Sequence, residues 1–195
     1  MQLPSPVRLL AVLTRPKEAW PEIAREPATL RTLYTGWILW LATIPPVASA
    51  IGVTLFWQRL AFVEAYIPGF SYTGTLIRAL IIGYLLQILL VSVLSWLISV
   101  LAVQFQGQAD LVQATKSVAY AMTPAWIAGV FQLFAGTALP ALVSLAAGLY
   151  GLYLLYLALP LTMRCPVAKS TAYLVVVALI AIVLQTIVGA TIGGV

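Results

Sequence analysis

The sequence predicts an all-α fold, a polytopic membrane protein with five transmembrane helices preceded by amphipathic helices at the membrane interface. Of its 195 residues, 63% are hydrophobic and 8% are charged, whereas about 25% of the residues of a soluble domain are charged. Five apolar runs are each long enough, at about 1.5 Å per residue, to cross a hydrocarbon core of roughly 30 Å. They cover residues 32–56, 76–103, 117–135, 138–163 and 171–193. Inside lipid the backbone must satisfy its own hydrogen bonds, and these runs can do so only as helices.

The distribution of basic residues divides the chain and predicts its orientation. We expect a cytoplasmic amphipathic tail, residues 1–31, followed by a five-helix membrane domain, residues 32–195. Because cytoplasmic segments carry an excess of Lys and Arg, the N-terminus is expected in the cytoplasm and the C-terminus outside. Only Arg59 and Arg78 fall near the connection after the first span. The cations on the expected cytoplasmic side are Arg8, Arg15, Lys17, Arg25, Arg31, Lys116, Arg164 and Lys169.

The tail carries Trp20 and Ile23 at a spacing that places both on one helix face. Arg15, Lys17 and Arg25 accompany them. This pattern is typical of one or two short helices that lie on a membrane surface, beside anionic headgroups. The alternative is a disordered basic tail that only sets the topology of the spans.

The first span contains Pro45 and Pro46. Two adjacent prolines remove two backbone donors and predict a kink or a broken helix at mid-membrane depth. The break could serve as a hinge or a binding site, as broken helices do in transporters, or as a packing kink. We favour the packing kink, because the sequence shows no symmetric partner for the broken helix.

Polar side chains form two stripes within the predicted spans. Gln87 lies near the middle of the second span, and Tyr150 and Tyr153 lie in the fourth. Such side chains either join helices by hydrogen bonds or line a path for a solute, and we favour the first role. The other members are Ser92, Ser95, Ser99 and Tyr156. Small residues in the later spans allow close helix packing, within one chain or between copies in a homo-oligomer.

The sequence offers little for catalysis or cofactor binding. It has no histidine and one cysteine, Cys165, so it lacks the commonest general base and the commonest transition-metal ligand. The acidic residues lie in the tail or in connections, and Arg78 and Lys116 lie at span edges, from which they can reach the surface. We expect no enzyme activity, no cofactor and no metal. The net charge of +5 indicates contact with anionic lipid, and nucleic acid is not an expected partner.

Two stretches carry a recognisable pattern: GQADLVQATKSVAYAMTPAW, residues 107–126, and GLYGLYLLYLALPLTMRCPVAKSTAYLVVV, residues 148–177. With the Tyr120-x-x-x-Pro124 element and the Pro-Val-x-Lys turn from Pro166 to Lys169, the chain resembles the bacterial branch of the Yip family, the Ypt/Rab-interacting membrane proteins. The resemblance implies five spans and a place in the bacterial inner membrane. In eukaryotic relatives it implies scaffolding of Rab GTPases and vesicle coats. That role is not carried over, because the tail here is short and has no long acidic or proline-rich extension.

We hypothesise a non-enzymatic membrane protein that organises partner proteins or lipids through its basic tail and intracellular loops. The alternative is a passive channel or a small-solute transporter. A site is expected first where the third span begins and beside the connection between the fourth and fifth spans. The candidate functional residues are Asp110, Lys116, Tyr120, Pro124, Tyr150, Tyr153, Arg164, Lys169 and Gln87.

Overall fold

The computed structural model describes residues 6–57 and 72–193 of the chain. Residues 1–5, 58–71 and 194–195, which include Arg59 of the predicted outer connection, lie outside this description. The described part is helical and contains no strand. Its helices long and apolar enough to cross a membrane are Leu30–Leu55, Leu80–Phe105, Leu111–Phe134, Leu139–Thr162 and Val167–Ile187. Each overlaps one predicted span, so the prediction of an all-α protein with five transmembrane helices is confirmed.

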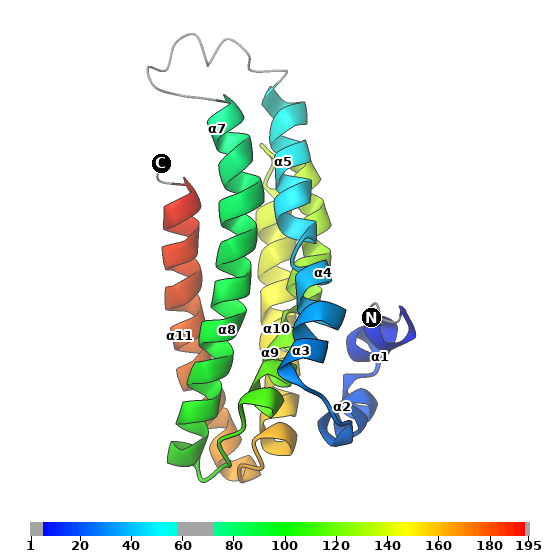
Figure 1. The fold of residues 1–195 in the computed structure, drawn as a ribbon, viewed down its shortest axis with the longest axis vertical. Helices are drawn as coiled ribbons and strands as arrows, with labels where there is room; N and C mark the ends of the chain where they lie inside the picture. Colours follow the sequence, from blue (N-terminus) through cyan, green and yellow to red (C-terminus); the bar gives the residue numbers. More distant parts are fainter. Residues whose placement is uncertain (1–5, 58–71, 194–195) are drawn as a thin grey trace.

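The spans stand side by side in an elongated bundle (Figure 1). Two short helices precede it, α1 (Pro6–Thr14) and α2 (Pro16–Arg25). The first span is assembled from α3 (Leu30–Leu33), η1 (Tyr34–Ile38), α4 (Leu39–Leu41) and α5 (Ile44–Trp57). The second comprises α7 (Tyr72–Ile77), η2 (Arg78–Ile82), α8 (Gly83–Ala102) and η3 (Val103–Phe105). The third comprises α9 (Leu111–Ala128) and η4 (Gly129–Phe134), and the fourth and fifth are α10 (Leu139–Thr162) and α11 (Val167–Gly193).

The first span is broken between α4 and α5, directly before its proline pair. Thr43 Oγ1 donates a hydrogen bond of 2.7 Å to the carbonyl of Trp40 at this break. The third span passes so close to it that a Cβ atom on Gly129 would lie 2.6 Å from Pro45 Cγ. The break is thus packed tightly against a neighbouring helix, which supports its interpretation as a packing kink.

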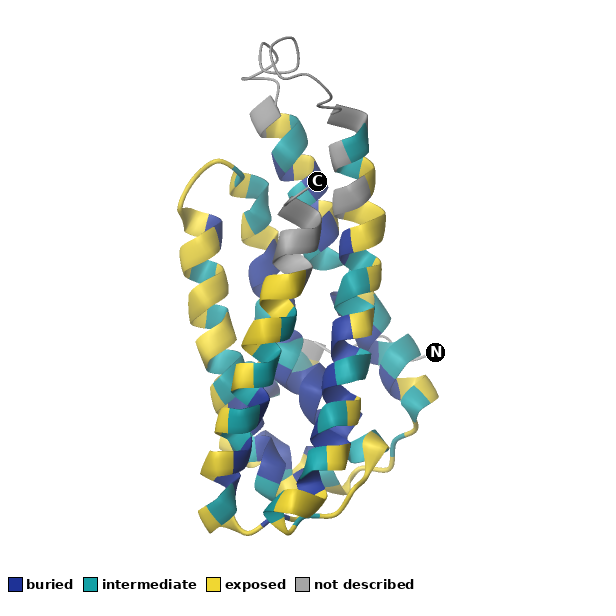
Figure 2. Cartoon of the chain, turned by 90° about the vertical axis from the view of Figure 1, so that its left-hand side faces the viewer, coloured by how far each residue is buried: buried dark blue, intermediate teal, exposed yellow. Residues whose placement is uncertain are grey.

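α9 forms the centre of the bundle. It packs against both α8 and α10 and is the most buried of the five spans. α10 and α11 are the least buried, and Figure 2 shows exposed residues along both helices. Their exposed side chains are mostly large and apolar. In a bilayer this surface faces lipid tails, which solvate it as well as a protein core would.

Two serines of the stripe in the second span, Ser92 and Ser95, form hydrogen bonds. Ser92 Oγ lies 2.7 Å from Tyr34 Oη of the first span. Ser95 Oγ donates to the carbonyl of Val91 one turn earlier, also at 2.7 Å. The contact of Ser92 supports the interpretation that the stripe joins helices. Ser95 instead bonds within its own helix.

The α8–α9 and α10–α11 connections meet at one end of the bundle (Figure 1). The backbone amide of Gln108 donates a hydrogen bond of 2.8 Å to the carbonyl of Met163. Gln106 and Arg164 adopt the left-handed conformation, with φ of 62° and 51°, which turns the chain sharply after a helix. The two connections therefore form one continuous surface.

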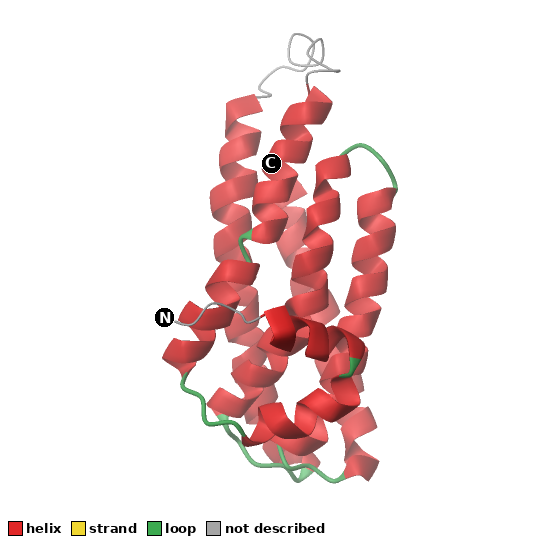
Figure 3. Ribbon diagram, turned by 90° about the vertical axis from the view of Figure 1, so that its right-hand side faces the viewer, coloured by secondary structure: helices red, strands yellow, loops and turns green. Residues whose placement is uncertain are grey.

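The two N-terminal helices lie against the side of the bundle near this same end (Figure 3). α2 packs mainly against α10 and buries Trp20 and Ile23, which are 1% and 2% exposed. Val12 of α1 is also buried, whereas Val7 and Leu10 are exposed. The helices expected in the tail are present, and the apolar face of α2 contacts the bundle instead of lipid.

Candidate functional site

The candidate site begins at the N-terminus of α9, which Asp110 caps. Its Oδ1 atom accepts hydrogen bonds from the backbone amides of Val112 and Gln113 at 2.9 and 3.0 Å. Aspartate is a preferred N-cap because it satisfies amides that have no partner within the helix. The cap starts α9 at Leu111, before the predicted boundary at residue 117. Lys116 consequently lies inside the helix.

Lys116 anchors α2 to the bundle. Its side chain is buried, with 2% of the residue exposed. Nζ donates hydrogen bonds to the backbone carbonyls of Ile23 at 2.9 Å and Glu26 at 2.7 Å. Carbonyls at a helix C-terminus lack partners within the helix, and a cation is favourable beside them. The expectation that Lys116 reaches the membrane surface is therefore wrong, because the nearest unsatisfied acceptors belong to the protein.

An ion pair joins α1 to the end of α2. The guanidinium of Arg8 forms an ion pair with the carboxylate of Glu26. Burial lowers the pKa of Arg8, but its hydrogen bonds to Glu26 and Tyr120 outweigh burial and raise that pKa above its usual value. Glu26 thus binds Arg8 through its side chain and Lys116 through its backbone carbonyl.

Tyr120 lies between two tryptophans that join α9 to the tail and to the first span. The ring of Trp20 meets it edge-on with 6.2 Å between centroids, and the tilted ring of Trp37 lies at 4.6 Å. Trp37 Nε1 also donates to Thr123 Oγ1 at 3.0 Å. Aromatic pairs in such arrangements contribute about 0.5–1.5 kcal/mol each beyond the area that they bury. Tyr120 is consequently a structural centre of the tail interface.

Two further side chains of the bundle bind backbone carbonyls of the tail. Tyr150 Oη of α10 donates to the carbonyl of Leu13 at 2.7 Å. Gln113 Nε2 of α9 donates to the carbonyl of Ala24 at 3.2 Å. Gln113, Lys116 and Tyr150, which we call the docking residues, therefore bind the C-terminal ends of both tail helices.

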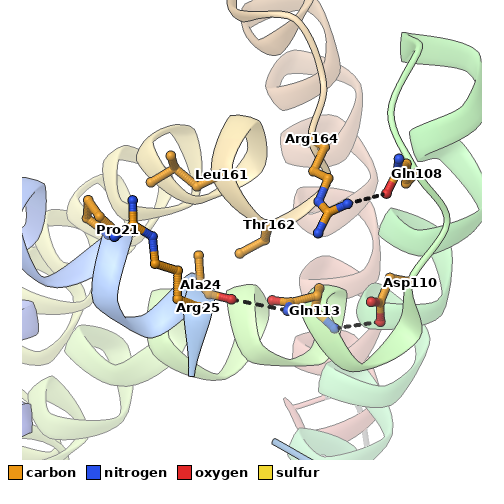
Figure 4. Close-up of a pocket in the computed structure, with 9 residues that line it drawn as sticks. All are labelled: Pro21, Ala24, Arg25, Gln108, Asp110, Gln113, Leu161, Thr162 and Arg164. Atoms are coloured by element: carbon orange, nitrogen blue, oxygen red, sulfur yellow. Dashed lines mark hydrogen bonds between the residues drawn. The ribbon is translucent and has the colours of Figure 1, made fainter. Parts of the chain in front are cut away.

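A pocket of about 640 Å³ opens between α2, the start of α9, the end of α10 and the two connections (Figure 4). Its charged residues are Arg25, Asp110 and Arg164. Arg164 Nη1 donates to Gln108 Oε1 at 3.2 Å, across the two connections. The other lining residues are Pro21, Ala24, Gln113, Leu161 and Thr162. The pocket has the size of a small-ligand site, and we call it the Arg25–Arg164 pocket.

The structure brings together most, but not all, of the predicted site residues. Lys116, Tyr120 and Tyr150 lie at the tail interface, and Asp110 and Arg164 lie in the adjoining pocket. The other four are apart from these contacts. Pro124 is buried inside α9, Tyr153 is exposed on α10 with its ring 5.8 Å from that of Tyr150, Lys169 lies in the first turn of α11, and Gln87 lies within α8.

The pocket also contains three charged or amide side chains that the sequence does not predict as site residues: Arg25, Gln108 and Gln113. The sequence places Arg25 in an amphipathic tail helix beside anionic headgroups but does not assign it to a site. Gln113 follows the capping Asp110 by three residues, a spacing that places both in the first turn of α9. That signal could have identified Gln113. Among the residues that the structure describes, no three His, Cys, Asp or Glu side chains gather to hold a metal ion.

Residues 10–189 match the model of the Yip1 domain. The chain is 30% identical over 151 residues to the inner membrane protein YohC of Escherichia coli strain K12, a match that covers 76% of this chain and 75% of that protein. YohC of Escherichia coli O6:H1 strain CFT073 matches with the same identity and coverage. No solved structure matches the chain with statistical significance.

Proposed function

Since the chain belongs to the Yip1 family of membrane proteins, we propose that it is a non-enzymatic protein that organises partner proteins or lipids at the cytoplasmic face of a bacterial inner membrane. Its similarity to an inner membrane protein supports this location. The excess of cations in the tail and around the α8–α9 and α10–α11 connections supports a cytoplasmic position for that end of the bundle.

The observation that carries the proposal is the docking of the tail. Gln113, Lys116 and Tyr150 bind the ends of α1 and α2 through backbone carbonyls. The tail helices are therefore held in place, and their exposed cations have defined positions on the bundle. A prearranged surface binds more tightly than a flexible one, because less conformational entropy is lost on binding. The exposed cations of this surface are Arg15, Lys17, Arg25, Arg31 and Arg164.

The role of Lys116 supports a function without catalysis. Among the acidic and basic residues whose burial the structure describes, it is the one that is buried within a span. Its ammonium is occupied by two backbone carbonyls. A buried ionisable group in a membrane protein usually marks a reaction or transport site, whereas here the charge has a structural partner.

The proposal is tested by crosslinking in native membranes. A photoreactive amino acid is placed at Lys17, on the tail surface, and in a matched control at Thr137, in the connection between η4 and α10. Both positions are exposed. We expect discrete protein or lipid adducts at position 17 and none of the same composition at position 137. Equal adduct patterns at the two positions would contradict a specific role for the tail surface.

A further inference from the structure

We propose that the Arg25–Arg164 pocket binds the headgroup of a phospholipid whose singly charged phosphodiester also bears hydrogen-bond donors, the chemistry of phosphatidylglycerol. This inference rests on the proposed function and specifies the lipid that the tail and loop surface takes.

Two guanidinium groups supply the site for the phosphate. Arg25 reaches the pocket from α2, and Arg164 reaches it from the α10–α11 connection. Gln108 holds Arg164 by a hydrogen bond of 3.2 Å, so this guanidinium is positioned before a ligand arrives. Guanidinium groups bind phosphate oxygens through paired, charge-assisted hydrogen bonds. With the carboxylate of Asp110, the charged lining residues carry a net single positive charge, which matches one phosphodiester.

A buried acceptor on a residue that lines the pocket, Gln113 Oε1, offers a site for a donor on the ligand. Gln113 Nε2 is bound to the Ala24 carbonyl, while Gln113 Oε1 is buried and has no hydrogen-bond partner. A buried acceptor without a partner destabilises the protein, because its lost hydrogen bond to water is not replaced. The hydroxyl groups of a glycerol headgroup would satisfy it, whereas the methylated ammonium of a choline headgroup has no N–H or O–H to donate.

The position of the pocket favours a lipid over a soluble phosphate ester. Thr162, which lines the pocket, is the last residue of α10, so the pocket lies where a membrane-spanning helix leaves the hydrocarbon core. Headgroup phosphates occupy that depth. Leu161 also lines the pocket and is 44% exposed. An exposed leucine at the rim offers an apolar path for the acyl chains, which a soluble ester does not need.

Lipid retention by the full-length protein tests the inference. Wild-type protein is reconstituted in nanodiscs of phosphatidylcholine with a small fraction of phosphatidylglycerol, and bound lipid is counted by native mass spectrometry after release. The double variant Arg25→Gln/Arg164→Gln removes the two pocket cations. The control Lys169→Gln removes a cation at the same end of the bundle that lies apart from the pocket and from the tail surface.

We expect the pocket variant to bind phosphatidylglycerol at least about tenfold more weakly, a loss of about 1.4 kcal/mol, and the control to bind as the wild type does. An equal loss in both variants would overturn the inference, because it would indicate general surface attraction. Equal displacement by soluble glycerol phosphate at the concentration of the lipid would overturn the assignment to a lipid.

A measurement on the wild-type protein alone tests the inference even if the pocket variant fails to fold. Phosphatidylglycerol should raise the thermal unfolding temperature relative to phosphatidylcholine alone, since a ligand that binds only the folded state stabilises it. No difference between the lipids would overturn the inference. Crosslinking at position 17 tests the proposed function independently, because the adducts formed there do not depend on the pocket.

Discussion

The ammonium of Lys116 lies 2.7 Å from the backbone carbonyl oxygen of Glu26. It therefore binds the main chain of Glu26, and the Glu26 carboxylate pairs with Arg8 instead. The distinction matters because a backbone contact survives substitution of the Glu26 side chain. It also means that α9, the most central helix, directly holds the end of the tail.

Replacing Lys116 by methionine should release α2. The change keeps an unbranched side chain of similar length but leaves the carbonyls of Ile23 and Glu26 without their partner. We expect the free energy of unfolding to fall by about 2–4 kcal/mol. Trypsin should also cleave faster at Lys17 and Arg25 in detergent, which mass spectrometry of the fragments would measure.

The control for that variant is Glu26→Gln. It removes the partly exposed ion pair with Arg8 but keeps the backbone carbonyl that Lys116 binds. We expect a loss of at most about 1 kcal/mol, as for most exposed ion pairs, and little change in cleavage. A greater effect from Glu26→Gln than from Lys116→Met would show that the carboxylate is the true anchor.

Tyr150→Phe should loosen α1 without disturbing the spans. The variant removes the hydroxyl that donates to the Leu13 carbonyl at 2.7 Å and keeps the ring. We expect a loss of about 0.5–1.5 kcal/mol and faster hydrogen exchange in the peptide that joins α1 to α2. Tyr153→Phe, at an exposed ring on the same helix, should leave the exchange unchanged. Indistinguishable exchange in the two variants would remove Tyr150 from the docking residues.

Gly129→Ala should destabilise the contact between the third span and the break in the first. The new Cβ would lie 2.6 Å from Pro45 Cγ and 2.9 Å from Pro45 Cα, so a helix must shift. Overpacking of this kind costs about 1–3 kcal/mol, which thermal unfolding in detergent would detect. Gly148→Ala is the matched control, because nothing lies within 4 Å of its added Cβ. A stable Gly129→Ala variant would mean that the break adapts easily.

The orientation of the chain can be measured by cysteine labelling. In a Cys165→Ser background, Lys17→Cys should react with a membrane-impermeant maleimide only after spheroplasts are permeabilised. Thr137→Cys, beyond the third span, should react from outside. These outcomes follow from the excess of cations at the tail end of the bundle. The reverse labelling pattern would place the tail and the Arg25–Arg164 pocket outside the cell.

The spans and the broken helix could be predicted because they depend on local sequence. Length and hydropathy define a membrane helix, and the pair Pro45–Pro46 interrupts one wherever it occurs. The role of Lys116 could not be predicted in this way. Its partners Ile23 and Glu26 are about ninety positions away in the chain, and their acceptors are backbone atoms, which every residue type carries. Hydrophobicity alone placed Lys116 outside the third span, whereas the Asp110 cap starts the helix earlier.

The pocket was only half predictable for the same reason. The sequence predicts Asp110 and Arg164 as site residues because they are charged and lie next to spans. Arg25 joins them because α2 folds back against α10, and an amphipathic pattern does not reveal whether its apolar face rests on lipid or on protein. The buried Trp20 settles this for α2, since its ring meets Tyr120 of the bundle.

The long sequence separation of the docking contacts also sets an order of events during synthesis. Lys116 is made 93 residues after Ile23, and Tyr150 is made 137 residues after Leu13. At 5–20 residues per second, the ribosome needs roughly 5–30 s to supply both partners. For that interval α1 and α2 exist without the helices that will cover them, and Trp20 and Ile23 must find another apolar surface. The nascent tail thus meets the bilayer or the insertion machinery first, and docking is among the last steps of assembly.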